Sequence, residues 1–468
     1  MKKGRVYEGI VERIDFPNKG IVYLAEEDRY ATVKNTIPQQ QIKFIINKFK
    51  RGNAEGRLLE VLESSPLENR KPVCSIFPAC GGCTYQTMSY ESQLAMKEEQ
   101  VRQIMDKAIE GEYIFEGILP NPQEFRYRNK MEFSFGDEYK DGPLSLGLHK
   151  KGSMYDIMTA GDCQLVHEDM TKILLCVLDY FSDRQVSYYK KMQHVGYLRH
   201  LLLRRGEVTG EILVNLVTSS QESHDLQPLV LTLQNLPLEG RIVGILHILN
   251  DSLSDVVQSD EMRVLDGQDY FHENLLGLQF KITPFSFFQP NTKGAEVLYT
   301  IVRNYIMESR LAKNGLTPMQ KQNEITVFDL FSGTGTIAQV LAPLVKQVIG
   351  VELVEEAVIV AKENATGNGL TNCRFIAGDV LQALDEIPEK PDVIILDPPR
   401  DGIHPKTLPK ILAYEVEKII YISCKPTSLA RDLGMMQEAG YRVERLIGLD
   451  QFSQTVHVEV VALLTKVQ

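Results

Sequence analysis

The chain has 468 residues, which exceeds one ordinary domain, and at roughly 150 residues per domain about three are expected. Hydrophobic residues make up 43% and charged residues 24%, a mixture that excludes a disordered or fibrous chain. The net charge of −11 argues against a generic nucleic-acid coat protein. Because no run approaches the roughly 18 apolar residues of a membrane helix and no signal-peptide core is seen, we expect a cytoplasmic protein with no membrane partner.

Residues 1–65 are predicted to form a small β-barrel. Short runs with alternating apolar positions are separated by turn residues, a pattern typical of such barrels. These runs are Tyr7–Ile14, Gly20–Leu24, Tyr30–Val33 and Gly56–Leu62. The stretch Lys43–Arg57 holds five basic residues against one Glu, which fits a phosphate-facing edge or an ordinary solvated surface equally well.

Residues 66–280 form the second predicted unit, a mixed α+β domain. Tyr90–Gly111 has helical spacing, and its expected apolar face consists of Leu94, Val101, Ile104, Met105 and Ala108. This helix could pack on the third domain. From about residue 119 the pattern returns to strands and turns. Lys190–Arg205 carries five basic residues and no acid beside several tyrosines, which fits either an RNA-facing surface or a solvated edge.

Residues 281–468 form the third predicted unit, a doubly wound and mostly parallel sheet. After about residue 324, strand, loop and helix alternate, as expected for this architecture. The expected strands are 325–330, 347–351, 373–376, 392–396, 418–423 and 456–464. Residues 324–468 contain 20 acidic and 13 basic residues, so most of the negative charge of the chain is in this unit.

A cofactor site is predicted at the carboxyl edge of this sheet. Residues 327–336 read as a strand, a Gly-x-Gly loop and a helix, in which glycines let the backbone approach a ligand closely. Glu352 ends the next strand, where a carboxylate can accept hydrogen bonds from both hydroxyls of a ribose. Asp379 and Asp397 follow the third and fourth strands. Because the loop lacks G-x-G-x-x-G, an adenosine ligand without pyrophosphate, S-adenosylmethionine, fits better than NAD.

Cys424 is the candidate nucleophile, since it follows the apolar strand 418–423 at the same edge. Lys425 and Arg431 are expected to lower the pKa of its thiol. Such a thiolate suits methylation at carbon 5 of a pyrimidine, because its addition to carbon 6 makes carbon 5 nucleophilic. A base must then remove the proton from carbon 5. Glu459 is the candidate, because flanking valines would desolvate its carboxylate and raise its pKa. His457 is a rival base.

Three cysteines within ten residues, Cys74, Cys80 and Cys83, suggest a metal centre, with Cys163 as a possible fourth ligand. Four thiolates suit either tetrahedral zinc or an iron–sulfur cluster, and the spacing does not separate the two. The pattern is not that of a radical enzyme, which would have three residues between its first two cysteines.

Taken together, these residues resemble the RNA uridine-5 methyltransferases, closest to the 23S ribosomal RNA (uracil-C5)-methyltransferases of the RlmD/RumA type. The match extends over essentially the whole chain. It implies an N-terminal OB-like TRAM barrel that binds RNA, a central iron–sulfur domain, and a C-terminal Rossmann-like class I methyltransferase domain. The tRNA enzyme of the family lacks the barrel and the cysteine cluster, which favours 23S rRNA as the partner, with a single-stranded or flipped uridine and a monomeric enzyme.

The resemblance also assigns residues. Cys74, Cys80, Cys83 and Cys163 would hold a [4Fe-4S] cluster, and Phe125–Lys130 is similar to the RNA-contacting segment of the family. The S-adenosylmethionine contacts would be Gln289, Phe331, Glu352, Asp379 and Asp397. Cys424 matches the nucleophile signature and Glu459 the base signature. Two positions depart from the family: Lys425 stands where Asn is common, and Thr336 where the ribosomal enzyme has Asn.

Three other functions fit less well. A tRNA uridine is the alternative substrate. An N6-adenine methyltransferase would share the sequence Asp397-Pro398-Pro399, but Arg400 stands where that class has an aromatic residue that stacks on the flipped base. A non-catalytic RNA-binding iron–sulfur protein would not need Cys424 and Glu459.

Overall fold

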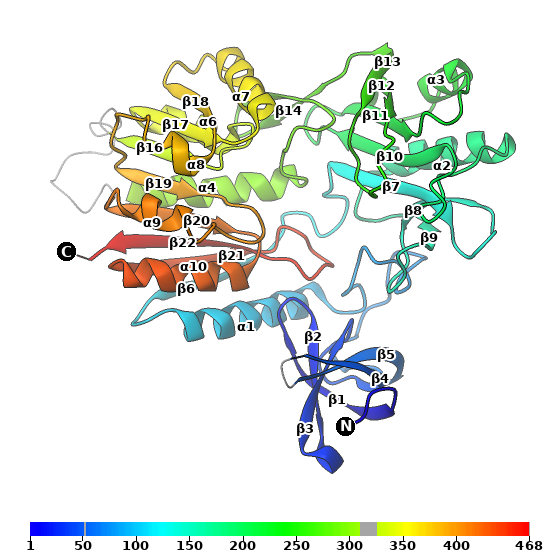
Figure 1. The fold of residues 1–468 in the computed structure, drawn as a ribbon, viewed down its shortest axis with the longest axis horizontal. Coiled ribbons are helices and arrows are strands. Elements are labelled where there is room, and N and C mark those ends of the chain that lie inside the picture. The colour runs from blue at the N-terminus through cyan, green and yellow to red at the C-terminus, as the bar shows by residue number, and fades with distance from the viewer. Residues whose placement is uncertain (51–52, 309–324, 468) are drawn as a thin grey trace.

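The computed structural model describes residues 1–50, 53–308 and 325–467. Within these ranges the chain forms a barrel and two large sheets (Figure 1). The helix α1 (Tyr90–Ala108) lies between the barrel and the C-terminal sheet. No helix in the described ranges is long and apolar enough to cross a membrane.

The N-terminal strands close into a five-stranded barrel in the order β1-β2-β3-β5-β4, which confirms the predicted barrel. The strands are β1 (Val6–Asp15), β2 (Lys19–Leu24), β3 (Arg29–Lys34), β4 (Gln41–Lys50) and β5 (Asn53–Glu63), with a 3-10 turn at Ala25–Glu27. Alternate residues point inward, so that Val11, Val33 and Phe44 fill the barrel while basic side chains of the same strands face solvent. Residues 51 and 52 of the basic stretch lie outside the described ranges.

The central sheet has seven strands in the order β13-β12-β11-β10-β7-β8-β9. They are β7 (Lys130–Asp137), β8 (Leu144–His149), β9 (Ile157–Thr159), β10 (Leu198–Arg205), β11 (Glu211–Thr218), β12 (Arg241–Leu249) and β13 (Glu261–Gly267). Helices α2 (Glu168–Asp183) and α3 (Gln227–Gln234) share one hydrophobic core with strands of this sheet. A hairpin of β14 (Phe271–Leu275) and β15 (Leu278–Ile282), followed by α4 (Thr292–Glu308), leads to the C-terminal sheet.

Three arginines of the stretch 190–205, Arg199, Arg204 and Arg205, are buried rather than presented to RNA or solvent. Arg199 donates to the carbonyls of Asn250 and Ser252, both at 2.8 Å. These guanidinium groups therefore hold neighbouring loops, because a buried cation requires hydrogen-bond acceptors. The sequence suggested either an RNA-facing surface or a solvated edge for this stretch, and neither describes these three buried residues.

The C-terminal sheet has eight strands in the order β18-β17-β16-β19-β20-β22-β21-β6, which confirms the predicted doubly wound, Rossmann-like sheet. Its strands are β6 (Ile114–Leu119), β16 (Thr326–Leu330), β17 (Gln347–Glu352), β18 (Cys373–Ala377), β19 (Val393–Leu396), β20 (Lys418–Ser423), β21 (Tyr441–Leu449) and β22 (Glu459–Lys466). The strands from β18 to β20 are parallel to one another, whereas β22 is antiparallel to β20 and to β21.

Helices cover both faces of this sheet. One core contains residues of α4, α6 (Thr336–Leu341) and α7 (Glu355–Gly367). The other contains residues of α1, α8 (Val380–Ala383), α9 (Thr407–Leu412) and α10 (Pro426–Glu438). A 3-10 turn at Ala342–Leu344 follows α6. The central strands β16, β19 and β20 are mostly apolar because both of their faces are buried.

The domain ranges expected from the sequence remain a prediction, and the C-terminal sheet includes a strand from outside the range 281–468. Strand β6 and helix α1 come from the range 66–280, yet β6 pairs with β21 at the edge of the C-terminal sheet. Helix α1 packs beside α10, and the side chain of Gln437 in α10 donates to the carbonyl of Ala108 at 2.8 Å. The catalytic sheet therefore depends on a segment more than 150 residues earlier in the chain.

The pairing of β6 with β21 can be tested at Gly448. A Cβ atom at this position would lie 2.6 Å from Cγ1 of Ile118, a β-branched side chain that cannot easily turn away. We expect Gly448→Ala to lower the free energy of unfolding by about 1–3 kcal/mol, the usual cost of overpacking. The measurement is calorimetric melting of the purified chain.

Gly434→Ala is the matched control, because a Cβ atom at Gly434 in α10 meets no atom within 4 Å. Alanine is favoured over glycine in a helix by about 1 kcal/mol, so this variant should melt at or above the native temperature. Equal melting of the two variants would contradict the tight contact between β6 and β21.

Candidate active site

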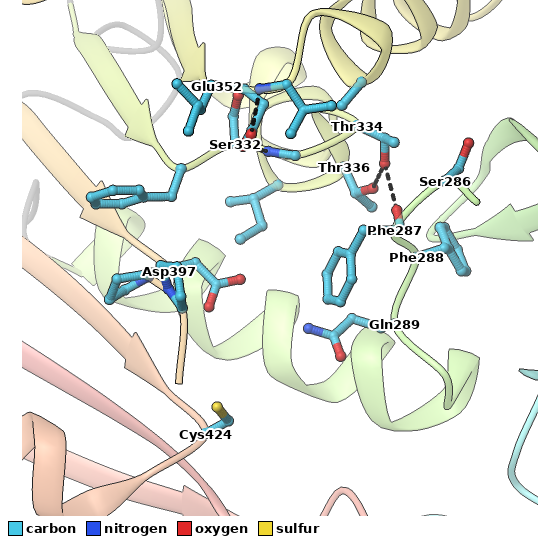
Figure 2. A pocket seen from close by; sticks show the side chains of 18 of the residues that line it. Ser286, Phe287, Phe288, Gln289, Ser332, Thr334, Thr336, Glu352, Asp397 and Cys424 are labelled. Carbon is cyan, nitrogen blue, oxygen red and sulfur yellow. Dashed lines mark hydrogen bonds between the residues drawn. The ribbon is translucent and has the colours of Figure 1, made fainter. Parts of the chain in front are cut away.

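One cavity of about 1030 Å³ opens at the carboxyl ends of the parallel strands of the C-terminal sheet. All seven residues predicted to bind the cofactor or to react line it: Gln289, Phe331, Glu352, Asp379, Asp397, Cys424 and Glu459. Phe331, Glu352, Asp379, Asp397 and Cys424 follow or end parallel strands, whose carboxyl ends meet at one edge of the sheet. Gln289 precedes α4, and Glu459 begins the antiparallel strand β22. In Figure 2, Asp397 lies between Cys424 and the part of the cavity that holds Glu352.

The glycine loop after β16 forms one end of this cavity. Phe331, Gly333 and Gly335 all adopt positive φ, and a Cβ atom at Gly335 would lie 2.5 Å from the ring of Phe375. Glycine is therefore required there both for backbone conformation and for space. The hydroxyl of Thr334 donates to the carbonyl of Phe287 at 3.0 Å (Figure 2), which joins the loop to the segment that carries Gln289.

The carboxylate of Glu352 is oriented by the backbone. The amide of Gly333 donates to Oε2 at 2.9 Å and the amide of Val354 donates to Oε1 at 3.0 Å. A carboxylate has about four acceptor sites, so each oxygen can still accept a further bond from a ligand hydroxyl. Asp379 is the N-cap of α8 and accepts from the amide of Leu381 at 2.8 Å. Both residues are thus placed for hydrogen bonds to a polar ligand.

Three buried carboxyl groups lie in or under the cavity, and burial raises the pKa of each. The pKa of Asp397 is raised to about 7 and that of Asp329 to about 8. The pKa of Glu459 is raised to about 8, first by burial and then by the charge of Asp397, against an opposing effect of Arg400. Desolvation disfavours the charged form of an acid, so these groups hold protons more strongly than exposed carboxylates.

The environment of Cys424 differs from the one expected from the sequence. Burial and the charges of Glu459 and Asp397 raise the pKa of the thiol to about 11, and Arg400 is the cation that opposes them. The ammonium of Lys425 donates to Asp401 at 3.1 Å, and the guanidinium of Arg431 donates to Asp432 at 2.8 Å. The expectation that Lys425 and Arg431 lower this pKa is therefore wrong, because both cations are paired with other acids.

His457 is held as a neutral hydrogen-bond donor. The guanidinium of Arg400 donates to Nδ1 of His457 at 2.9 Å, and burial followed by the charge of Arg400 lowers the pKa of the imidazole to about 4. This bond assigns the ring proton to Nε2. Because the acceptor nitrogen is occupied, His457 is a weaker candidate than Glu459 for the role of base.

Sequence reasoning assigned no role to Arg400, Asp329 or Phe452. Arg400 and Phe452 line the cavity, and the guanidinium of Arg128 lies over the ring of Phe452 at 5.3 Å. A signal was present for Arg400, which directly follows the Asp-Pro-Pro sequence at the end of β19. Phe452 lies in the loop between β21 and β22, and its proximity to Arg128 depends on contacts across the chain.

The four cysteines predicted to bind metal come together from distant parts of the chain. Cys74, Cys80, Cys83 and Cys163 line one small cavity of about 10 Å³, and all four are free thiols. Burial raises the pKa of Cys83 to about 11 and that of Cys163 to about 12. Within residues 1–50, 53–308 and 325–467, no group of three or more His, Cys, Asp or Glu side chains is arranged to hold a metal ion. The iron–sulfur prediction is therefore not confirmed.

Comparison with known proteins identifies the family. The sequence model of the tRNA (uracil-5-)-methyltransferase family matches residues 89–467. A protein of Clostridium tetani named "uncharacterized RNA methyltransferase" is 47% identical over 466 residues, which cover 100% of this chain and 99% of that protein. A protein of Chlorobaculum tepidum named in the same way is 36% identical, covering 92% of this chain and 90% of its own.

The fold is shared with a solved structure, that of Pyrococcus abyssi tRNA (uracil-54, C5)-methyltransferase in complex with S-adenosyl-L-homocysteine. The similarity has a TM-score of 0.75 at 24% identity and covers 98% of this chain and 100% of the other. With the family match and the extended identity to RNA methyltransferases, this agrees with the resemblance found in the sequence. The chain belongs to the tRNA (uracil-5-)-methyltransferase family of S-adenosylmethionine-dependent RNA methyltransferases.

Proposed function

We propose that the chain, acting as a cytoplasmic monomer, methylates carbon 5 of a uridine in 23S rRNA, with Cys424 as nucleophile and Glu459 as base. The pairing of β20 with β22 is the observation that carries this proposal. Ser423 is the Cα partner of Val460 in this antiparallel ladder, so the next pair outward is Cys424 and Glu459. Opposed residues in such a ladder have Cβ atoms about 5 Å apart and point to the same face of the sheet, which supports the view that the thiol and the carboxyl act on one base.

In this proposal the reaction divides into an addition and an elimination. The thiol of Cys424 loses its proton to solvent, its sulfur forms a bond to carbon 6 of the uracil, and the electron pair of the 5,6 double bond makes carbon 5 nucleophilic. S-adenosylmethionine supplies the electrophilic methyl group that carbon 5 takes. Glu459 then accepts the proton from carbon 5, the double bond forms again, and the sulfur leaves carbon 6. A carboxylate whose pKa is raised to about 8 is a stronger base for this step than an exposed one.

Residues at the other end of the cavity would hold the cofactor. Glu352 has free acceptor sites for the ribose hydroxyls, while Gln289, Phe331, Asp379 and Asp397 line the same space. The target uridine must leave its base stack to reach Cys424, since a stacked base does not expose carbon 6 to the protein. Arg128 in the segment 125–130 and the ring of Phe452 lie at the cavity and could receive the flipped base.

A tRNA uridine is the second candidate substrate. The fold is shared with the Pyrococcus abyssi tRNA enzyme over 98% of this chain. This coverage includes most of the N-terminal barrel. The barrel therefore does not by itself favour rRNA. Methylation of purified rRNA and tRNA from cells that lack this protein, followed by mapping of 5-methyluridine, separates the two substrates.

We also propose that Cys74, Cys80, Cys83 and Cys163 hold a [4Fe-4S] cluster. The support is the donor set, four free thiols that reach one cavity although Cys163 is 80 residues beyond Cys83 in the sequence. The cavity is otherwise lined mainly by apolar side chains, including Ile76, Phe77 and Leu148, which would shield a cluster from solvent. The four thiols fit the ligand chemistry of such a cluster.

The role of Cys424 is tested by Cys424→Ala. We expect turnover to fall below detection, and the covalent complex with 5-fluorouridine RNA to disappear from denaturing gels, because no sulfur is left to add to carbon 6. Cys176→Ala is the matched control, since Cys176 lies in α2 in the central domain and should retain both activities. A covalent complex that survives Cys424→Ala would refute the assignment.

The role of Glu459 is tested by pH and by Glu459→Gln. The base must be ionised, so the rate of product release should rise with pH and level off near its pKa of about 8. Glu459→Gln should lower turnover by about 10²–10⁴-fold and leave methylated RNA bound to Cys424, since only elimination is blocked.

Glu444→Gln provides the control for this prediction, because Glu444 lies in the adjacent strand β21 and pairs with Arg442 away from the cavity. Its pH profile should match that of the native chain. Retention of normal turnover by Glu459→Gln would assign the proton transfer to another group.

The metal centre is tested by Cys80→Ser. We expect the purified native chain to contain iron and acid-labile sulfide, and Cys80→Ser to lose both and to melt at a lower temperature, because cluster binding stabilises the folded chain. Cys176→Ser should keep the native iron content. Zinc without sulfide in the native chain would refute the cluster and favour the tetrahedral metal site.

A further inference from the structure

Helix α1 buries a row of polar side chains on the face that contacts the rest of the protein. Gln93, Lys97 and Gln100 are all buried, and their spacing of four and three residues places them on one side of the helix. The sequence predicts an apolar face for this helix, and Val101 and Met105 do belong to it. Burial of three long polar side chains is costly unless each has a partner.

Gln93 and Lys97 have their partners in one loop, residues 450–458 between β21 and β22. The amide of Gln454 donates to Oε1 of Gln93 at 3.1 Å, and Nε2 of Gln93 donates to Oε1 of Gln454 at 3.1 Å. The ammonium of Lys97 donates to Oδ1 of Asp450 at 2.6 Å, with side-chain exposures of 1% and 0%. Helix α1 is thus hydrogen-bonded to this loop at Asp450, where the loop begins, and at Gln454, near its middle.

The same row reaches two other parts of the chain. Nε2 of Gln100 donates to the carbonyl of Ile14 in the barrel at 3.0 Å. Nε2 of Gln93 also donates to the carbonyl of Tyr85 at 3.1 Å, and the amides of Thr84 and Tyr85 donate to the carbonyl of Gln454 at 2.7 and 3.2 Å. Thr84 directly follows Cys83, so the cysteine segment and the loop are joined through backbone hydrogen bonds.

The loop 450–458 leads directly to the reacting groups. Phe452, His457 and Glu459 line the active-site cavity. The side chain of Gln451 donates to Oε1 of Gln289 at 3.0 Å, which connects the loop to the predicted cofactor contact. Gln454 has φ of +68°, a left-handed conformation that an L-residue keeps only when its surroundings enforce it. The two hydrogen bonds with Gln93 help to hold the backbone of Gln454 in this conformation.

We propose that Gln93 and Lys97 are positioning residues for the base, and that α1 holds loop 450–458 so that Glu459 faces carbon 5 of the bound uracil. This inference rests on the proposed function. It gives the barrel and the cysteine segment a role in the reaction, since both are hydrogen-bonded to the elements that hold the loop. An error of about 1 Å in the position of a catalytic group can cost about 10²-fold in rate, so a small shift of the loop is enough to impair proton removal.

The test is single-turnover methylation of substrate RNA by Gln93→Met and Lys97→Met with radiolabelled S-adenosylmethionine. We expect formation of the methylated covalent complex to stay within about threefold of native, because Cys424 follows β20 and lies outside the loop that Gln93 and Lys97 hold. Release of methylated RNA should slow by about 10–100-fold, since the proton on carbon 5 is removed inefficiently. The methylated protein–RNA complex should therefore accumulate on denaturing gels.

Gln103→Met is the matched control, because Gln103 is exposed on the same helix and its side chain donates to Glu99 of that helix. It should release product at the native rate. Lys97→Arg keeps a cation opposite Asp450 and should restore release at least in part. If Lys97→Met fails to fold because Asp450 is left buried and unpaired, Gln93→Met carries the test, since it changes no charge.

The outcomes separate the inference from the proposed function. If the native chain transfers no methyl group to carbon 5 of a uridine, the proposed function itself fails. If the native chain is active and Gln93→Met slows complex formation and release equally, or changes only the melting temperature, α1 is a structural support and the positioning role is refuted. Accumulation of the methylated complex in Gln93→Met but not in Gln103→Met is the result that supports it.

Discussion

The antiparallel pairing of β20 with β22 is the constraint on which the active site depends. All other neighbouring pairs from β18 to β20 are parallel, and their carboxyl ends supply loops that can line a cofactor cavity. Reversal of β22 brings the beginning of that strand, rather than its end, to the same edge. Cys424, which follows the last residue of β20, thereby comes to the same edge as Glu459, the first residue of β22. A parallel β22 would place Glu459 at the opposite edge of the sheet.

Burial then sets the chemistry of this pair. Burial raises the pKa of Asp397 and of Glu459, the charge of Asp397 raises that of Glu459 further, and both charges raise that of Cys424. Arg400 is the main cation that opposes this effect at both Cys424 and Glu459, and it also fixes the imidazole of His457. The titrations of these groups are therefore coupled, so that ionisation of one changes the proton affinity of the others.

Polar contacts, rather than apolar ones alone, join the parts of this protein. Lys97 pairs with Asp450, Gln100 with the barrel, and Arg199 with the loop after β12. Directional bonds of this kind fix orientation, whereas apolar packing tolerates sliding. Under the proposed function, such bonds would keep the barrel, the cysteine segment and the C-terminal sheet in one orientation toward the same nucleotide. They also explain why α1 buries glutamines and a lysine where amphipathic helices usually bury aliphatic residues.

The sequence by itself determined the barrel and the doubly wound sheet through local periodicity, and it pointed to five of the residues that line the cavity, Glu352, Asp379, Asp397, Cys424 and Glu459, through their positions on or next to strands. Gln289 and Phe331 came from the family resemblance. Only the tertiary structure decided the addition of β6 to the sheet, the burial of Arg199, Arg204 and Arg205, and the high pKa of Cys424. Each of these depends on groups distant in the sequence: β6 pairs with β21, Arg199 and Arg204 donate to carbonyls of other loops, Arg205 donates to the carboxylate of Asp169, and Cys424 lies near Glu459 and Asp397, whose charges raise its pKa. Periodicity reports which face of an element is buried, whereas the partner across that face is set by the folded chain.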